Sequence, residues 1–203
     1  MTSRFLNLVF SPSVKEAQQR YGSREAYSRR DGTTEPDQLT ENEAQFIATR
    51  DSMYMASIGA NGWPYIQHRG GPPGFIKVLN ARSLGIADFR GNRQYVSVGN
   101  LADDNRVALF LMDYPRRARL KILGRARAVD LAQASDLASA LIDPGYGAKV
   151  ERGIVIDVEA FDWNCPQHIT PRYTLAEIEP SIAALKARIA ELEAEVVKHR
   201  AMA

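Results

Sequence analysis

The chain has 203 residues, 45% of them apolar, and this length suits one domain with appendages. Its 26 basic and 24 acidic residues give a net charge of +2, without the excess of basic residues that is typical of bulk nucleic-acid binding. The single cysteine, Cys165, excludes an internal disulfide, and no segment reaches the roughly 20 apolar residues that cross a bilayer. We therefore expect a cytoplasmic protein that binds neither nucleic acid nor membrane.

The first part of the chain is polar and contains two helix patterns. Residues 1–37 predict an extension wrapped over the main body, with a short helix at Val14–Tyr21. Thr40 followed by Glu43 is a capping-box pattern, which predicts a helix over residues 40–50.

From Met53 the apolar pattern changes to that of β-strands. Asn61 and Gly62 predict a two-residue hairpin turn, and Gly124 predicts a bend or bulge in a long strand. Two helices are expected among the strands, one from Asn92 to about Val98 and one over residues 130–142. We interpret the pattern as about six short strands, which favours an antiparallel barrel with helical decoration over a doubly wound sheet. The strand-like segments are residues 53–59, 64–68, 75–79, 83–88, 106–113, 119–130 and 153–161.

The tail of the chain has a heptad pattern. Its large apolar residues follow spacings of 4, 3, 4, 3 and 4, which is an a/d seam over nearly three heptads. Two interpretations remain open, an amphipathic helix packed on its own barrel and a coiled coil with a second chain. The seam residues are Ile178, Ile182, Leu185, Ile189, Leu192 and Val196.

Three segments carry residues suited to an anionic ligand. Gln67, His68 and Arg69 precede two glycines, and this grouping fits either a phosphate contact or a polar strand end with a turn. Arg93 and Gln94 are expected in the first turn of a helix, where free N–H groups bind anions, although an exposed first turn is also common. The third segment is a strand with basic residues at every second position, which fits a solvated surface, a pocket wall or a nucleic-acid surface: Arg119, Lys121, Arg125 and Arg127.

The segment Phe161–Tyr173 is a proline-punctuated loop rich in functional side chains. A metal site built on Cys165 and His168 would lack the usual four-ligand spacing, so no metal is expected. A plain buried thiol is favoured for Cys165 over a nucleophile, because nearness in sequence does not establish geometry.

Taken in order, five segments resemble the pyridoxamine 5′-phosphate oxidase-like, FMN-binding split-barrel superfamily over residues 40–173. The segments are NGWPYIQHRGG, GFIKVL, ADFRGNRQYVSVGNL, RLKILGRARAV and DWNCPQHI. The closest resemblance is to the flavin-nucleotide-binding branch of unknown substrate. It implies a mainly β fold with helices, an antiparallel six-stranded split β-barrel at 38–173, between an N-terminal extension (1–37) and a long C-terminal amphipathic helix (174–203).

The resemblance also implies a homodimer with FMN at the subunit interface and a set of cofactor-binding residues. The strand after the first hairpin, the turn after the next hairpin and the long basic strand would contact the phosphate and the ring. The late Trp-containing loop would come from the partner subunit. The matching positions are Gln67, His68, Arg69, Gly70, Asp88, Arg93, Gln94 and Arg119 and, in the late loop, Trp163, Gln167 and His168.

One departure from the family pattern bears on the reaction. True pyridoxamine-phosphate oxidases carry an Arg-x-His pattern in the terminal segment, whereas this chain reads Gln167-His168-Ile169-Thr170-Pro171-Arg172. We therefore expect an FMN-dependent oxidoreductase acting on an unidentified small substrate and not on vitamin B6, with no catalytic residue assigned. The alternatives are a flavin carrier or sensor without turnover and a haem-binding or haem-degrading protein with His168 as axial ligand.

Overall fold

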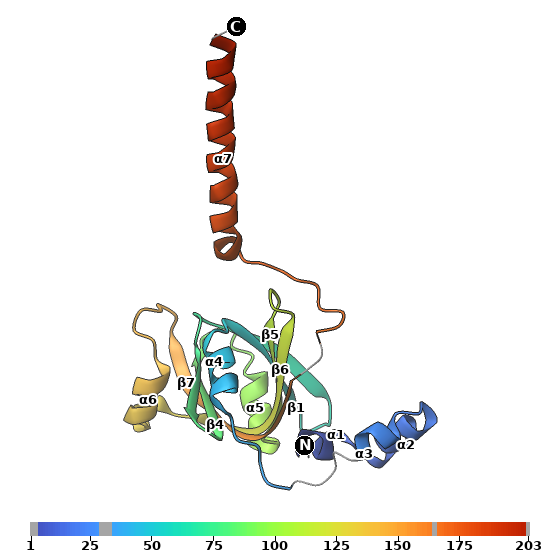
Figure 1. The fold of residues 1–203 in the computed structure, drawn as a ribbon. Coiled ribbons are helices and arrows are strands. Elements are labelled where there is room, and N and C mark those ends of the chain that lie inside the picture. Colours follow the sequence, from blue (N-terminus) through green and yellow to red (C-terminus); the bar gives the residue numbers. More distant parts are fainter. Residues whose placement is uncertain (1–3, 29–33, 164–165, 202–203) are drawn as a thin grey trace. The chain divides into compact units, whose positions relative to one another are not determined.

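The computed structural model describes residues 4–28, 34–163 and 166–201. Its contacts divide the chain into two compact units, one of Met1–Asp113 with Ala118–Pro166 and one of Tyr114–Arg117 with Gln167–Ala203. The first unit holds the β-sheet and the second holds the C-terminal helix (Figure 1). Among the described residues, no helix has both the length and the apolar character needed to span a membrane.

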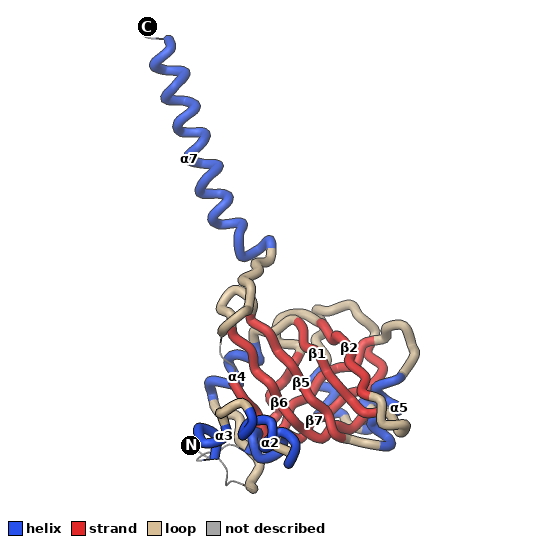
Figure 2. Tube along the Cα trace, turned by 90° about the vertical axis from the view of Figure 1, so that its right-hand side faces the viewer, coloured by secondary structure: helices blue, strands red, loops and turns tan. Residues whose placement is uncertain are grey.

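The first unit is built on one antiparallel sheet of seven strands, in the order β2-β1-β5-β6-β7-β4-β3. Figure 2 shows β2, β1, β5 and β6 side by side, as this order requires. The prediction of an antiparallel sheet with helices is confirmed. The strands are β1 (Ser52–Ile58), β2 (Pro64–Gly70), β3 (Ile76–Asn80), β4 (Ser83–Phe89), β5 (Arg106–Asp113), β6 (Ala118–Val129) and β7 (Val150–Trp163).

The predicted count of six strands was wrong, because every one of the seven strand-like segments pairs in the sheet. The expected closure was also wrong, since within the described part of the chain β2 and β3 remain the two edges of an open sheet. β7 begins three residues earlier and ends two residues later than the last predicted strand. β7 pairs with β6 at one side and with β4 at the other, and the extra residues extend both pairings: Val150 and Arg152 pair with β4, and Asp162 and Trp163 pair with β6.

Gly62 lies in the turn that joins β1 to β2, where it adopts a φ of 83°. The predicted two-residue hairpin was wrong, because Ile58 pairs with Pro64 and the loop spans residues 59–63. The predicted bulge at Gly124, within β6, is confirmed. At Gly124 the β6–β7 register shifts, and a Cβ built there would lie 2.6 Å from the Asp157 carbonyl oxygen. Glycine is therefore required at Gly124 by the close approach of the neighbouring strand.

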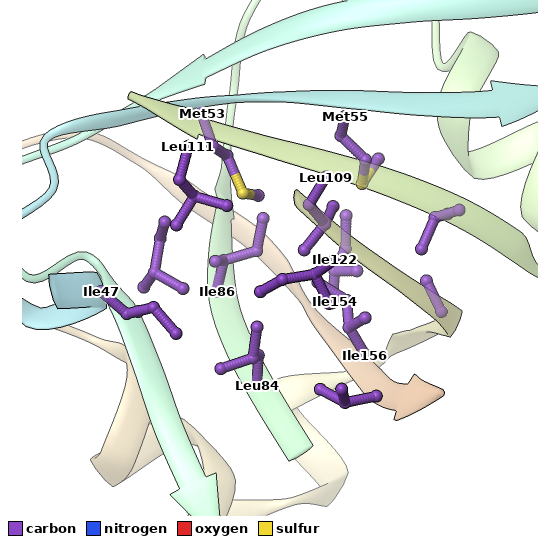
Figure 3. Close-up of a cluster of buried hydrophobic side chains, with 14 of the residues drawn as sticks. Ile47, Met53, Met55, Leu84, Ile86, Leu109, Leu111, Ile122, Ile154 and Ile156 are labelled. Atoms are coloured by element: carbon purple, nitrogen blue, oxygen red, sulfur yellow. The ribbon is translucent and has the colours of Figure 1, made fainter. Parts of the chain in front are cut away.

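The core lies on the inner face of the sheet, where alternate strand residues meet (Figure 3). Met53 and Met55 of β1, Ile154 and Ile156 of β7 and Ile47 of a helix have exposed fractions of 1% or less. Period-two alternation places these strand residues on one face and leaves their neighbours on the other.

Short helices cover parts of this sheet. α4 (Glu41–Ala48) begins at the predicted capping box of Thr40 and Glu43. α5 (Val96–Asp103) and α6 (Ser135–Leu141) bury Leu101 and Leu141. The helix expected over 130–142 is broken, because Asp130 caps a 3₁₀ turn over Leu131–Gln133 before α6 begins.

The N-terminal helices are α1 (Arg4–Val9), α2 (Pro12–Arg20) and α3 (Arg24–Ser28). Ser11 caps α2 through the Val14 N–H, and this helix includes most of the predicted segment. Phe5 of α1 is buried, and Arg4 forms an ion pair with Glu159 of β7 at 3.3 Å. α1 therefore lies against β7.

The second unit contains α7 (Leu175–Ala201), the longest helix among the described residues. Glu177 accepts hydrogen bonds from the backbone N–H and the hydroxyl of Thr174, at 2.8 Å and 3.0 Å. This capping box satisfies otherwise free groups at the start of the helix.

Candidate functional site

A cavity of about 230 Å³ lies where β2, β4 and the start of α5 come together. We call it the arginine cavity. Its lining includes Gln67 and Arg69 of β2, Asp88 of β4, the loop of residues 90–95 and Glu151 of β7.

The pairing of β2 with β1 decides which side chains face this cavity. Gln67 and Arg69 lie opposite Met55 and Met53, whose side chains are buried in the core. They therefore face the inner side of the sheet. His68 borders the cavity but alternates to the outer face, where its ring meets Tyr54 edge-on at 5.5 Å.

Asp88 of β4 binds two arginines, Arg69 of the edge strand β2 and Arg152 of the adjacent strand β7. Its Oδ1 accepts a short hydrogen bond from Arg69, and its Oδ2 accepts one from Arg152 at 3.2 Å. The Arg69 side chain is 9% exposed, and its buried Nε–H has no hydrogen-bond partner among the described residues. A buried guanidinium donor without a partner is costly, so Arg69 retains an unused capacity to bind an acceptor.

A second set of hydrogen bonds orients Gln67. Its side-chain oxygen accepts a hydrogen bond from the hydroxyl of Ser97 at 2.8 Å and one from Arg69 at 3.4 Å. Ser97 is buried in the first turn of α5, and Asn100 of the same helix donates to Ser57 of β1 at 3.0 Å. These bonds tie α5 to the two strands beside the cavity.

The loop between β4 and α5 differs from the predicted helix over 92–98. Asn92 accepts a hydrogen bond from the Gln94 N–H at 3.1 Å, a local turn that competes with helix formation. Arg93 and Tyr95 adopt left-handed φ angles of 61° and 55°, so the helix begins only at Val96. Arg93 and Gln94 therefore lie in the loop before the helix. Left-handed backbone at non-glycine residues costs of order 1–3 kcal/mol each and clusters at functional sites.

Glu151 connects this loop to the sheet. It accepts hydrogen bonds from Arg90 at 2.9 Å, from Arg152 at 3.2 Å and from the Tyr95 hydroxyl at 3.3 Å. The bond from Arg90 is the main reason that the pKa of Glu151 lies below its ordinary value. Tyr95 also packs under the Arg152 guanidinium, 5.0 Å from the ring centre.

The charges around the cavity do not balance. Arg69, Arg90, Arg93 and Arg152 face two carboxylates, Asp88 and Glu151, in and beside the lining. The excess of two positive charges suits a doubly negative group.

The start of α5 adds N–H donors to the same wall. Val96, Ser97 and Val98 line the cavity, and Tyr95, at the N-cap position, makes no side-chain capping bond. Uncapped N–H groups and the helix dipole favour an anion at this position. Seven of the eleven predicted site residues border the cavity: Gln67, His68, Arg69, Gly70, Asp88, Arg93 and Gln94.

The other four lie elsewhere. Trp163 packs edge-on against Phe46 at 4.8 Å and donates its indole N–H to Glu43 at 2.7 Å. The guanidinium of Arg119 lies over Phe110, 5.4 Å from the ring centre, and its buried Nε has no partner in the described ranges. Gln167 and His168 belong to the second unit, where His168 has a φ of 62°. Cys165 lies outside the described residues.

The basic stripe of β6 makes surface ion pairs in this structure. Lys121 pairs with Asp162 at 2.7 Å, and Arg125 pairs with Glu159 at 3.0 Å, both from β7. None of the four stripe residues lines the arginine cavity. Of the three interpretations of the stripe, these contacts favour a solvated surface.

Sequence reasoning missed Ser97, Tyr95, Glu151 and Arg152. Ser97 and Tyr95 lie in the segment that drew attention to Arg93, but the expected helix start concealed their positions. Arg152 and Glu151 precede the predicted start of the last strand. Extending that strand by two residues would have placed Arg152 beside Asp88, its observed partner in the β4–β7 register.

Comparison with known proteins gives one family match and several solved structures. Residues 39–173, more than half of the chain, match the family model described as pyridoxamine 5′-phosphate oxidase. Among curated proteins, none matches this chain.

Two of the solved structures that are similar to this chain show how low the sequence identity is. A putative pyridoxamine 5′-phosphate oxidase from Lactobacillus delbrueckii is 20% identical, with a TM-score of 0.47 over 62% of this chain and 93% of that chain. An FMN-binding protein from Syntrophomonas wolfei is 12% identical, with a TM-score of 0.44 over 75% of this chain and 95% of that one.

Proposed function

The chain belongs to the pyridoxamine 5′-phosphate oxidase family, and from this premise we propose that its arginine cavity binds FMN. The phosphate is held by Arg69 and by the N–H groups at the start of α5. Asp88 of β4 and Arg152 of β7 support Arg69 of β2, and Gln67 lies beside the ribityl chain or the ring.

The observation that carries this proposal is the excess positive charge around a cavity that Arg69 and the uncapped start of α5 both line. A phosphate monoester carries about −1.5 to −2 charges near neutral pH and offers three strong acceptor oxygens. It would accept hydrogen bonds from these groups and offset the two surplus positive charges. Arginine is suited to this role because its guanidinium is planar and permanently charged.

The size of the cavity supports a site shared between two chains. At about 230 Å³ it is smaller than the roughly 300–1,000 Å³ typical of pockets that enclose a small molecule. A cavity of this size suits the phosphate end of FMN, and the ring would extend beyond it. We propose that a second copy of the chain covers the ring in a homodimer and contributes Gln167 and His168.

The proposed activity is that of an FMN-dependent oxidoreductase on an unidentified small substrate. Bound FMN would supply the hydride or electron transfer. The chain's own groups bind and orient it: both carboxylates at the cavity are held by arginines, and the ring of His68 lies on the outer face. No proton-transfer group is therefore assigned at the cavity. The same observation keeps a flavin carrier without turnover as the second candidate.

The binding proposal is tested by comparing FMN with riboflavin, which lacks the phosphate. Arg69→Ala removes a charged hydrogen-bond donor worth about 1.5–3 kcal/mol, so FMN affinity should fall about 10- to 100-fold. Riboflavin affinity should change little. Arg127→Ala is the matched control, because Arg127 is exposed on β6 and outside the cavity.

Fluorescence-quenching titration of both ligands with both variants measures these affinities. If Arg69→Ala lowers the affinities for FMN and riboflavin equally, or lowers neither, then Arg69 does not bind the phosphate. Anaerobic mixing of the FMN-loaded protein with NADH or NADPH then separates the two candidate functions. Bleaching of the flavin absorbance supports the oxidoreductase, and unchanged absorbance with both donors supports the carrier.

A further inference from the structure

Within the second unit, no other described residue covers the apolar seam of α7. Its middle residues Ile182, Leu185, Ile189, Leu192 and Val196 have exposed fractions between 41% and 65%. They recur at spacings of 3 and 4 along one continuous helix (Figure 1). Large apolar residues exposed at this period are typical of a helix that pairs with another helix.

The residue types along the seam indicate what kind of helix covers it. In heptad positions, Ile182, Ile189 and Val196 occupy a, and Leu185 and Leu192 occupy d. In parallel coiled coils, β-branched residues at a with leucine at d favour two strands over three or four.

The charged residues beside the seam fit a second copy of the same helix. In a parallel pair, a g residue faces the e residue of the partner's next heptad. Arg188 at g would face Glu193 of the partner subunit, and Glu195 at g would face Arg200 of the partner subunit. Because the two helices are identical, each of these two ion pairs forms twice. The register that aligns the apolar layers therefore also joins opposite charges.

We propose that α7 forms a parallel, in-register, two-stranded coiled coil with α7 of a second copy of this chain. The inference goes beyond FMN binding, because α7 needs no flavin to pair. A parallel arrangement brings the two Leu175 ends together. It would therefore raise the effective concentration of one sheet-containing unit near the other.

Antiparallel pairing is the main competing arrangement. It also joins opposite charges, since Arg188 would face the partner's Glu195 and Lys186 would face the partner's Glu193. The charges alone therefore do not decide the direction. The a and d residue types match the pattern described for parallel dimers, which is the form proposed, and the crosslinking test below decides between the two directions. The two arrangements differ most clearly at the ends of the helix.

Cysteine crosslinking of the full-length chain distinguishes the arrangements. In a Cys165→Ser background, His199→Cys places a thiol at a d position near the helix end. In the parallel form the two thiols face each other, and we expect rapid disulfide formation in a glutathione redox buffer. In the antiparallel form residue 199 faces residue 182 of the partner, so the two thiols lie about 25 Å apart along the axis.

Two further pairs of variants make the test specific to the seam. Leu185→Glu with Leu192→Glu should lower the crosslinking rate of His199→Cys by about tenfold or more, because both seam leucines become charged. Ala187→Glu with Ala194→Glu adds the same charge at f positions and should leave the rate unchanged. Arg188→Glu should slow crosslinking, and Arg188→Glu with Glu193→Arg should restore it, because the parallel g–e pair is then re-formed.

The outcomes divide clearly. Crosslinking at residue 199 that the seam variant abolishes and the f-position control retains supports the proposal. If crosslinks form instead between chains carrying Ile182→Cys and chains carrying His199→Cys, the helices are antiparallel and the proposal is wrong. Absence of both crosslinks means that another partner covers the seam, which also overturns it. FMN affinity measured on the same seam variants reports separately on the arginine cavity.

Discussion

The contact between Trp163 and Glu43 joins the end of β7 to α4, and its removal makes a quantitative prediction. The indole N–H donates to Glu43 at 2.7 Å, and the Glu43 side chain is almost wholly buried. Trp163→Phe keeps an aromatic ring beside Phe46 but removes the donor. A hydrogen bond to a charged group contributes about 1.5–3 kcal/mol, so the free energy of unfolding should fall by about that amount.

The expected change in melting temperature follows from the size of the chain. For proteins of 150–250 residues, 1 kcal/mol shifts Tm by about 2–4 °C, so Trp163→Phe should lower Tm by about 3–12 °C. The chain offers a matched control in its other tryptophan, Trp63, which is 75% exposed. Trp63→Phe should leave Tm nearly unchanged.

The destabilisation caused by Trp163→Phe should become smaller as the pH falls. Burial alone would raise the pKa of Glu43, but hydrogen bonds from Thr40 and Trp163 outweigh it, so the pKa lies below the ordinary value of 4.5. A carboxyl whose pKa is lowered on folding contributes stability above its unfolded pKa and loses it as the pH falls through the folded value. The difference between Trp163→Phe and the wild type should therefore be full at pH 7 and shrink below pH 4.5.

Thermal unfolding followed by circular dichroism between pH 7 and pH 3 measures this difference. The reasoning is refuted if Trp163→Phe melts with the wild type at pH 7, or if its deficit is constant across the pH range. The same variant tests the prediction that Trp163 contacts FMN across a dimer. A loss of FMN affinity at 25 °C, where the variant remains folded, would support that contact.

Two other variants test the packing of the sheet and the support of the cavity. Gly124→Ala should destabilise the fold by about 1–3 kcal/mol, because its Cβ would lie 2.6 Å from the Asp157 carbonyl oxygen, whereas Gly85→Ala should cost less, because its neighbours are the movable ends of Leu141 and Leu79. Urea unfolding compares the two, and equal costs would contradict the argument from backbone contact. Ser97→Ala removes the 2.8 Å hydrogen bond that orients Gln67 and should weaken FMN binding about fivefold, a loss of about 1 kcal/mol, if the proposed function holds. An FMN titration identical to that of the wild type would exclude this orienting role.

Much of the fold could be predicted because its signals are local. The capping box at Thr40 depends on residues close together in the chain and is observed. The seven strand-like segments could also be read locally, and each of them forms a strand. The length of the turn at Asn61–Gly62, the register shift of Gly124 against β7 and the open sheet could not be obtained in this way. They depend on which strands pair, and pairing is decided by contacts between segments far apart in sequence.

The difference between local and long-range signals also explains which residues of the candidate site could be predicted. Gln67 and Arg69 were predicted because their strand ends beside two glycines, and Asp88 was predicted from the family resemblance; the structure brings all three to one cavity. The helix start was misplaced because a local Asn92–Gln94 turn and two left-handed residues delay it to Val96, and no periodic pattern predicts such backbone. Tryptophan is a residue type common in ligand-binding sites, but the indole N–H of Trp163 donates to the buried carboxylate of Glu43.

The arrangement of the arginines around Asp88 explains how this cavity can remain folded before a ligand arrives. Four guanidiniums at close range would repel one another, and two carboxylates bind three of them: Asp88 binds Arg69 and Arg152, and Glu151 binds Arg90 and Arg152. The fourth, Arg93, donates to the Tyr95 hydroxyl at 3.3 Å. Arg152 is shared, so the network holds Arg69 in place while leaving its Nε–H unused. The carboxylates thus reduce the repulsion without cancelling the positive charge. A phosphate that binds there completes a network that the protein has already ordered, which lowers the entropic cost of binding.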